Sequence, residues 1–319
     1  MATFGEKFRW LNRYVTSNFQ CKVLRKILPF ETFRNRRIRY YKRLTGRFTE
    51  PEAVNEQLKE WIEKGKPFAV TRNGMSETSL FTLLERDAIW GSSSFHKNDT
   101  SLNFDGDRQK LMKYREVLKQ MYRESDVVCA WYIVNMEEDL LSKYLGNALL
   151  TKTHLVDLYD YEGCWIRALK GKKVLVVSPF VETIESQYPK RELLHRNKDT
   201  LPEFTLFTVK SVWWYSAGRD SRFQSWFEVL DYLYQECMAV DFDIALLSCA
   251  TFSSPLAVRL KQAGKQAVHM GGMLQLLFGI KGKRWDTMQL YNEHWVRLPD
   301  ETKVGNVNVL DQTQGGIYW

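Results

Sequence analysis

The amino-acid sequence predicts an α/β protein with a mostly parallel sheet flanked by helices, preceded by a basic, helical N-terminal extension. Short apolar runs, typical of strands buried on both faces, alternate with stretches of helical periodicity, and glycine or proline separates the two. The charge distribution sets the extension apart. We therefore expect a basic, aromatic segment at 1–50 and one α/β domain at 51–319.

The net charge of +8 is concentrated in the first fifty residues. They hold 13 Lys and Arg against Glu6, Glu31 and Glu50 (13 − 3 = +10), whereas the rest of the chain holds 33 basic and 35 acidic residues (33 − 35 = −2). Aromatic and aliphatic residues interleave with the cations, partly at helical spacing. This pattern suits an anionic membrane surface, a solvated helical hairpin packed on the domain or on a partner, or nucleic acid. We favour the membrane and disfavour nucleic acid, because the remainder carries no matching basic patch.

Composition and cysteine usage exclude several classes of protein. In 319 residues, 44% are hydrophobic and evenly spread, which excludes a disordered chain. No apolar run reaches the roughly 18 residues of a membrane span, and the first ten residues do not resemble a signal peptide. The five cysteines are far apart and lack CxxC pairs, so we expect buried thiols, a reducing compartment and a cytoplasmic location.

The elements of the α/β part follow in order along the chain. In the first half we expect a helix over 52–64, a strand over 68–71, a helix that begins at Ser76 or Glu77, a strand over 126–132 and a helix over 137–150. In the second half we expect strands over 174–177, 204–209, 244–247 and 267–270 and helices over 226–240, 256–263 and from Gly272 to about Gly279. Ser254 is the expected N-cap of the helix over 256–263, with Pro255 in its first turn.

Four loops follow expected strands: 72–77, 178–180, 248–254 and 269–275. Ligands of open α/β sheets bind outside the carboxyl ends of the strands, so the site should lie there. The residues that we expect to contribute from these loops are Arg72, Gly74, Glu77, Ser178, Ser248, His269, Gly271, Gly272 and Gln275.

Paired glycines at a strand-to-helix junction let a ligand approach the backbone, and the helix that follows offers N–H groups to an anion such as a diphosphate. Gly271-Gly272 is equally explained by a tight turn. The downstream cations Lys281, Lys283 and Arg284, beside Trp285, form a basic loop that suits phosphates, with a ring for stacking on a base or sugar, or a solvated surface loop. Glu77 suits a general base, an acceptor for a hydroxyl group or a metal ligand, or equally a first-turn acid that complements the helix dipole.

Several stretches resemble a family of glycosyltransferases with the GT-D fold. They are KGKKVLVVSPF (170–180) with Ile184, Gln187 and Tyr188, FDIALLSCA (242–250), HMGGMLQLLFGIKGKRWD (269–286), YNEHWVR (291–297) and GGIYW (315–319). The resemblance covers roughly 55–319. It implies a Rossmann-like domain that transfers a sugar from a nucleotide-diphosphate donor, expected to be a UDP-sugar, to a glycan or lipid-linked acceptor in surface polysaccharide synthesis. The basic segment would then hold the enzyme at the inner membrane face.

Members of this family carry an Asp-x-Glu motif for metal and donor, within a segment like Arg-Phe-Gly-Asp-Gly-Glu. The resemblance makes Arg72 and Glu77 the expected catalytic residues and keeps Gly74, but Met75 stands at the Asp position, and a thioether does not bind Mg²⁺ or Mn²⁺. We therefore assign no metal ligands and leave a divalent cofactor open. Either the cations at 281–284 and the N–H groups near Gly272 replace the metal charge, or the chain is a nucleotide-sugar-binding scaffold without turnover.

Overall fold

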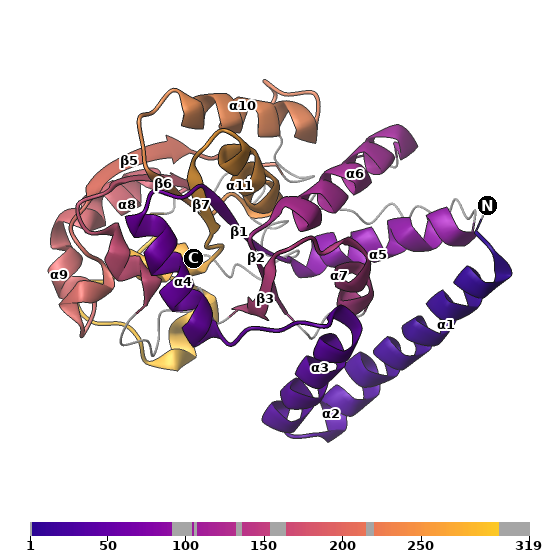
Figure 1. Cartoon of the computed structure of the whole chain (residues 1–319). Helices are drawn as coiled ribbons and strands as arrows, with labels where there is room; N and C mark the ends of the chain where they lie inside the picture. The colour runs from indigo at the N-terminus through magenta and orange to yellow at the C-terminus, as the bar shows by residue number, and fades with distance from the viewer. Residues whose placement is uncertain are drawn as a thin grey trace. The chain divides into compact units, whose positions relative to one another are not determined.

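The computed structural model describes residues 2–90, 104, 107–131, 136–153, 164–214 and 220–299 (Figure 1). The chain divides into two compact units. Unit 1 comprises Met1–Val54, Val70–Asp99 and Phe104–Leu155, and unit 2 comprises Asn55–Ala69, Thr100–Asn103 and Val156–Trp319. Of the helices described, none is long and apolar enough to cross a membrane. The GGIYW stretch at 315–319 lies outside the described residues.

The central sheet has seven strands in the order β3-β2-β1-β7-β6-β4-β5. The β1–β2, β2–β3, β4–β5, β4–β6 and β6–β7 pairs are parallel, which confirms the predicted α/β fold with a mostly parallel sheet. The strands are β1 (Phe68–Arg72), β2 (Val127–Ala130), β3 (Leu149–Lys152), β4 (Lys173–Ser178), β5 (Thr205–Lys210), β6 (Ile244–Leu247) and β7 (Gln266–His269). β2, β6 and β7 are buried along their whole length, as expected of a parallel sheet covered on both faces.

The first fifty residues are largely helical. A capping box starts the first helix, because the Thr3 hydroxyl accepts from the Glu6 amide while the Glu6 carboxylate accepts from the Thr3 amide. Gly46, in the left-handed region, ends the last helix of this segment. The helices here and after them in unit 1 are α1 (Phe4–Phe19), the π-helix η1 (Gln20–Leu24), α2 (Arg25–Ile27), α3 (Phe30–Thr45), α5 (Met75–Trp90), α6 (Arg108–Glu124) and α7 (Glu137–Tyr144), with α4 (Pro51–Glu63) spanning the boundary between the units.

Unit 2 alternates strands with helices and ends in a small two-stranded sheet. Its helices are η3 (Trp165–Leu169), α8 (Val181–Gln187), η4 (Tyr188–Lys190), α9 (Arg191–Leu194), η5 (Lys198–Thr200), α10 (Trp226–Met238), η6 (Ala250–Phe252), α11 (Ser253–Gln262), α12 (Met273–Leu277) and η7 (Lys283–Met288), and the small sheet pairs β8 (Ile280–Lys281) with β9 (Val296–Arg297). Four of the five cysteines are buried and all five are free thiols.

Two expected boundaries are wrong by three residues or more. The helix expected over 137–150 ends at Tyr144, and Leu149 and Leu150 belong to β3, where they pair with Val127 and Val128. Gly146 makes this turn possible, since a Cβ there would lie 2.1 Å from the Arg123 carbonyl oxygen. Leucine is common both in helices and in buried strands, so the spacing of the leucines did not show where the helix ends and the strand begins.

The second wrong boundary is the start of the helix expected over 256–263. α11 begins at Ser253, directly after η6, so Ser254 lies inside the helix and is not its N-cap. The Ser253 hydroxyl accepts from the Cys249 amide at 2.9 Å and holds this tight entry. The Ser254 hydroxyl is thereby left to bond His269.

The strand order reverses direction within unit 2. β4 pairs with β5 on one side and β6 on the other, and the chain continues from β6 to β7, away from β5. Loops that leave adjacent strands in opposite directions open a crevice at the carboxyl edge of a parallel sheet. Ser178, the last residue of β4, and Ser248, the first residue after β6, flank this point.

Candidate functional site

The turn after β7 is built around two glycines with different roles. Gly271 has φ +56° in the left-handed region, and its amide and that of Met270 both donate to the Leu247 carbonyl, at 3.2 and 2.9 Å. Gly272 makes room for an arginine, because a Cβ added there would lie 3.1 Å from Cζ, Nη1 and Nη2 of Arg284. The structure therefore places the Arg284 guanidinium directly over the glycine turn.

Trp285 anchors the basic loop. Its side chain is 4% exposed and packs with Leu276 and Trp295, and its amide donates to the Gly282 carbonyl at 2.9 Å. The Arg284 guanidinium lies 4.4 Å from the centroid of the Trp285 ring, so the buried indole holds the exposed cation by a cation–π contact. Trp285 thus orients Arg284, which is a different role from the exposed stacking surface considered from the sequence.

The other two cations of the loop differ from Arg284. The Lys281 ammonium lies 5.8 Å from the Tyr291 ring centroid, and Lys283 is exposed. The hydrogen bond and charge of Arg297 hold the pKa of Asp286 below its usual range, since the two side chains are 2.8 Å apart. Asp286, the carboxylate nearest in sequence to the basic loop, is therefore paired with Arg297. The charges of Lys281, Lys283 and Arg284 make the loop net positive.

Tyr291 is a structural residue of this loop that the sequence did not single out. Its hydroxyl donates to the Gly282 carbonyl at 2.7 Å and lies 3.2 Å from the Gly282 amide, which donates to it. The one feature of the sequence that could have identified Tyr291 is its place in the YNEHWVR stretch that carries the family resemblance. Through these bonds Tyr291 fixes the backbone between Lys281 and Lys283.

The helix after the glycines contributes less to an anion site than we expected. α12 has five residues, and its early amides are used locally, with Leu274 donating to Gly271 and Gln275 donating to Gly272. The dipole of so short a helix is small, because it sums only a few peptide units. Gln275 is 2% exposed, so it lies beneath the turn. Most of the positive charge at this turn therefore comes from the side chain of Arg284.

Serine and histidine side chains at the other strand ends make structural bonds. Nδ1 of His269 lies 2.8 Å from the Ser254 hydroxyl, which ties the end of β7 to α11, and both side chains are buried. The Ser178 hydroxyl accepts from the Phe180 amide at 3.2 Å and shapes the turn after β4. Ser248 is half-buried and donates its amide to the Val177 carbonyl at 2.8 Å.

In unit 1, Arg72 ends β1, Gly74 lies in the loop after it, and Glu77 lies in the first turn of α5. The Arg72 guanidinium lies 4.9 Å from the centroid of the Trp131 ring. Gly74 lies under the carboxylate of Glu77, because a Cβ at Gly74 would be 1.9 Å from Oε2 of Glu77. The Thr78 hydroxyl donates to the Gly74 carbonyl at 2.7 Å and closes the first turn of α5.

A buried carboxylate that the sequence did not identify supports this loop. Glu137, fully buried, accepts hydrogen bonds from the Asn73 side chain at 2.7 Å, the Trp131 amide at 3.0 Å and the Tyr41 hydroxyl at 2.6 Å. Burial and the charge of Glu137 raise the pKa of Tyr41 well above its usual value, so the phenol stays protonated and donates. In the sequence, Glu137 read only as an acid in the first turn of a helix.

The donor set around Glu77 does not fit a hard divalent cation. Residues that bind Mg²⁺ or Mn²⁺ supply several carboxylate or carbonyl oxygens. In the described parts of the chain, no group of three or more His, Cys, Asp or Glu side chains could hold a metal ion. The nearest sequence neighbours of Glu77 in the motif are a methionine and a serine. No chemical step is therefore assigned to a metal.

No family model matches the sequence, and no curated protein matches it. Solved structures with some similarity include a domain of unknown function 1792 described as having a distinct glycosyltransferase fold, at 16% identity and a TM-score of 0.44 over 83% of this chain and 96% of that one. A selenomethionine-substituted structure of domain of unknown function 1792 shares 17% identity, with a TM-score of 0.42 over 83% and 96% of the two chains. A glycosyltransferase with this domain, from Streptococcus sanguinis, shares 17% identity, with a TM-score of 0.43 over 78% and 94%.

Proposed function

We propose that the protein is a glycosyltransferase that uses a nucleotide-diphosphate sugar, with UDP-sugars as the first donors to test. The acceptor is a glycan or a lipid-linked glycan, and the pathway is the synthesis of a surface polysaccharide or glycoconjugate. The observation that carries the proposal is the Arg284 guanidinium over Gly272, at a turn that follows a central parallel strand. An exposed, planar guanidinium suits a diphosphate, which accepts bidentate hydrogen bonds.

In the proposed reaction, a bond forms between an acceptor hydroxyl oxygen and the anomeric carbon of the sugar. The bond from that carbon to the β-phosphate oxygen breaks, and its electron pair leaves with the nucleoside diphosphate. The acceptor proton passes to a general base. Arg284, together with Lys281 and Lys283, stabilises the charge that develops on the leaving group, in the role that a metal ion has in other transferases.

Calorimetric titration with UDP and a panel of nucleotide sugars, in EDTA, tests this charge replacement. We expect binding to persist in EDTA and to weaken about 10- to 100-fold in Arg284→Ala, the range for loss of a charge-assisted hydrogen bond. Arg196→Ala is the matched control, since Arg196 is an exposed arginine of the same unit outside the basic loop. Complete loss of binding in EDTA, or equal affinities of the two variants, would contradict the proposal.

Met75 in place of the family aspartate favours a second candidate function, a scaffold that binds nucleotide sugars without turnover. The two candidates differ in product formation. A transferase releases nucleoside diphosphate when an acceptor glycan is added, in amounts that match the glycosylated product. A scaffold binds the same donor in the same titration and leaves it intact over many hours.

A further inference from the structure

The first helix carries an apolar stripe on its outer side. Five of its side chains are 45% to 85% exposed: Phe4, Phe8, Leu11, Val15 and Phe19. They are spaced three or four residues apart, so they lie on one side of α1. Val23 in η1, which is 39% exposed, and Ile27 in α2, which is 70% exposed, continue the same spacing. These seven residues are called the outer stripe.

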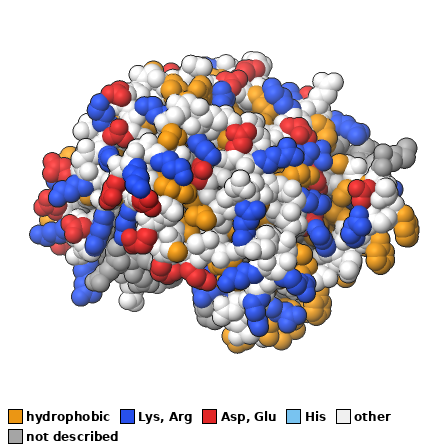
Figure 2. All heavy atoms as spheres, in the orientation of Figure 1, with side chains coloured by type: hydrophobic (Ala, Val, Ile, Leu, Met, Phe, Trp, Pro, Cys, Tyr) orange, Lys and Arg blue, Asp and Glu red, His pale blue; other side chains and the backbone are white. Residues whose placement is uncertain are grey.

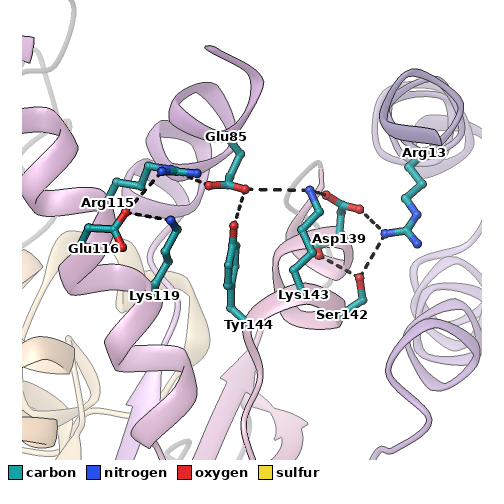
Figure 3. A network of polar contacts seen from close by, with 9 residues as sticks. All are labelled: Arg13, Glu85, Arg115, Glu116, Lys119, Asp139, Ser142, Lys143 and Tyr144. Carbon is teal, nitrogen blue, oxygen red and sulfur yellow. Dashed lines mark hydrogen bonds and ion pairs between the residues drawn. The ribbon is translucent and has the colours of Figure 1, made fainter. Parts of the chain in front are cut away.

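The polar side of the same helix faces the rest of unit 1. Arg13 forms an ion pair with Asp139 and lies 3.3 Å from the Ser142 hydroxyl, both on α7 (Figure 3). The Ser17 hydroxyl, fully buried, accepts from the Met136 amide at 2.8 Å. An amphipathic helix of a globular protein ordinarily buries its apolar side and exposes its charges. In α1 the apolar stripe is exposed instead, although Trp10 is buried and Glu6 and Arg9 are exposed.

Buried ion pairs prevent the helix from turning its stripe inward. Asp139 also pairs with Lys143, at 2.8 Å, and Lys143 in turn lies 4.0 Å from Glu85, which pairs with Arg115, as Figure 3 shows. Rotation of α1 would take Arg13 away from the buried Asp139 carboxylate and leave Lys143 as its remaining ion-pair partner, so these contacts favour the observed orientation of the helix. The contacts of Arg13 and Ser17 with the rest of unit 1 therefore keep the outer stripe on the exposed side of α1.

A second anchor lies further along the segment. The side-chain oxygen Oε1 of Gln20 accepts a hydrogen bond from Nη1 of Arg37 at 3.4 Å, and Arg37 pairs with Glu138 at 2.6 Å, with the side chains of both charged residues at most 2% exposed. This contact fixes η1 and α3 against α7. The π-helix at Gln20–Leu24 thus turns Gln20 inward while Phe19 and Val23 stay exposed.

Positive charge surrounds the outer stripe. In Figure 2, Lys and Arg side chains lie beside exposed hydrophobic ones along the part of the surface where Figure 1 draws α1 and α2. The exposed cations include Arg9, Lys22, Arg25 and Lys26 on the helices of the stripe, and Arg39 and Lys42 on α3. An apolar face bordered by cations is complementary to an anionic bilayer, where phenylalanines enter the acyl boundary and cations meet the headgroups.

We propose that the outer stripe is an in-plane docking surface for an anionic lipid bilayer. This goes beyond the proposed sugar transfer and does not depend on it. A second copy of the chain fits less well, because two segments that each carry +10 would face one another. Nucleic acid also fits less well, since the seven exposed apolar side chains of the outer stripe would meet phosphates.

Co-sedimentation of the full chain with vesicles tests the proposal, with phosphatidylcholine alone or mixed with phosphatidylserine. We expect binding to the anionic vesicles only, and a loss of at least about tenfold in Phe8→Ser/Phe19→Ser. Leu193→Ser is the matched control, because Leu193 is a 50% exposed leucine outside the stripe. The melting temperature should not fall in the double variant, since both rings are exposed in the free protein.

A charge-reversal pair tests the electrostatic part. Lys22→Glu/Lys26→Glu should weaken binding more than about 25-fold, at about fivefold for each cation lost, whereas the exposed control pair Lys170→Glu/Lys198→Glu should bind like the parent chain. Equal binding to both vesicle types, or to neither, would overturn the proposal. So would a dimer in sedimentation analysis that Phe8→Ser/Phe19→Ser dissociates, or DNA binding that survives in that variant and vanishes in the lysine pair.

Discussion

The side-chain amide of Asn73 donates a hydrogen bond to the buried carboxylate of Glu137, over 2.7 Å. Asn73 belongs to the loop that presents Arg72 and Glu77, and Glu137 begins α7, so the bond fixes that loop to a helix far along the chain. Glu137 also accepts from Tyr41 on α3. The geometry of the candidate loop therefore depends on the N-terminal helices as well as on β1.

Removal of the Glu137 carboxylate should destabilise unit 1 strongly. Glu137→Ala leaves the Asn73 amide, the Trp131 amide and the Tyr41 hydroxyl without their shared acceptor, at about 1–3 kcal/mol for each buried group. Tyr41→Phe removes a single donor and should cost only about 1 kcal/mol. Urea unfolding followed by tryptophan fluorescence measures both. Similar midpoints for Glu137→Ala and Tyr41→Phe would show that the three bonds do not act as described.

The strands were predictable because their residues satisfy a local condition. Ile244–Leu247 and Val174–Val177 are unbroken apolar runs, and such runs occur where both faces of a sheet are covered. Leu149 and Leu150 lack that distinction, because the same leucines continue the apolar spacing of the preceding helix. Only pairing with β2, a long-range contact, places them in a strand.

Residues that act through long-range contacts could not be found from the sequence. Glu137 is separated by 64 residues from Asn73 and by 96 from Tyr41, so no local pattern connects them. Trp285 illustrates a different limit: its position beside cations was visible, but its burial against Trp295 was not. The positive charge of residues 1–50 could be read from the sequence. The outward orientation of the outer stripe could not, because it depends on the long-range ion pair of Arg13 with Asp139.

Gly272→Ala should weaken donor binding through Arg284. The added Cβ would lie 3.1 Å from the guanidinium and displace it, so we expect affinity for UDP to fall about fivefold, or roughly 1 kcal/mol. Calorimetric affinities of the two single variants and the double variant for UDP show whether Gly272→Ala acts by displacing Arg284. Gly272→Ala should have no further effect in an Arg284→Ala background, because the displaced group is already gone. If the losses of UDP affinity in the two single variants add up in the double variant, Gly272 does not act through Arg284. Gly5→Ala is the control for a glycine-to-alanine change, because a Cβ there would lie 3.8 Å from its nearest neighbour.

The stability of unit 2 should depend on pH through His195. Burial lowers the pKa of its ring, and Nε2 donates to the Leu277 carbonyl at 2.8 Å. The folded-state pKa lies below the unfolded value of about 6.5, so between the two values the unfolded chain binds more protons. The free energy of unfolding should therefore fall as the pH drops from above about 6.5 through the folded pKa.

His195→Gln keeps a donor for Leu277 but has no titratable ring. Its unfolding free energy should change less with pH than that of the parent chain, and the difference between the two should appear only as the pH falls below about 6.5. Urea titrations at a series of pH values measure this. His294→Gln, at a ring that is 37% exposed, is the control. A parent chain and a His195→Gln variant with parallel pH profiles would rule out this source of pH dependence.

Met75→Asp should confer a response to divalent cations. The substitution completes an Asp-x-Glu pair with Glu77 at the start of α5, and two carboxylates with one residue between them offer the oxygen ligands that Mn²⁺ and Mg²⁺ prefer. We expect Mn²⁺ to bind this variant in calorimetry, whereas the parent chain should not bind it. Ser76→Asp is the control, because it adds the same charge next to Glu77 at the wrong spacing. If Met75→Asp and Ser76→Asp behave alike, position 75 does not correspond to the aspartate of the Asp-x-Glu motif, and the resemblance gives no support for a catalytic role of Glu77.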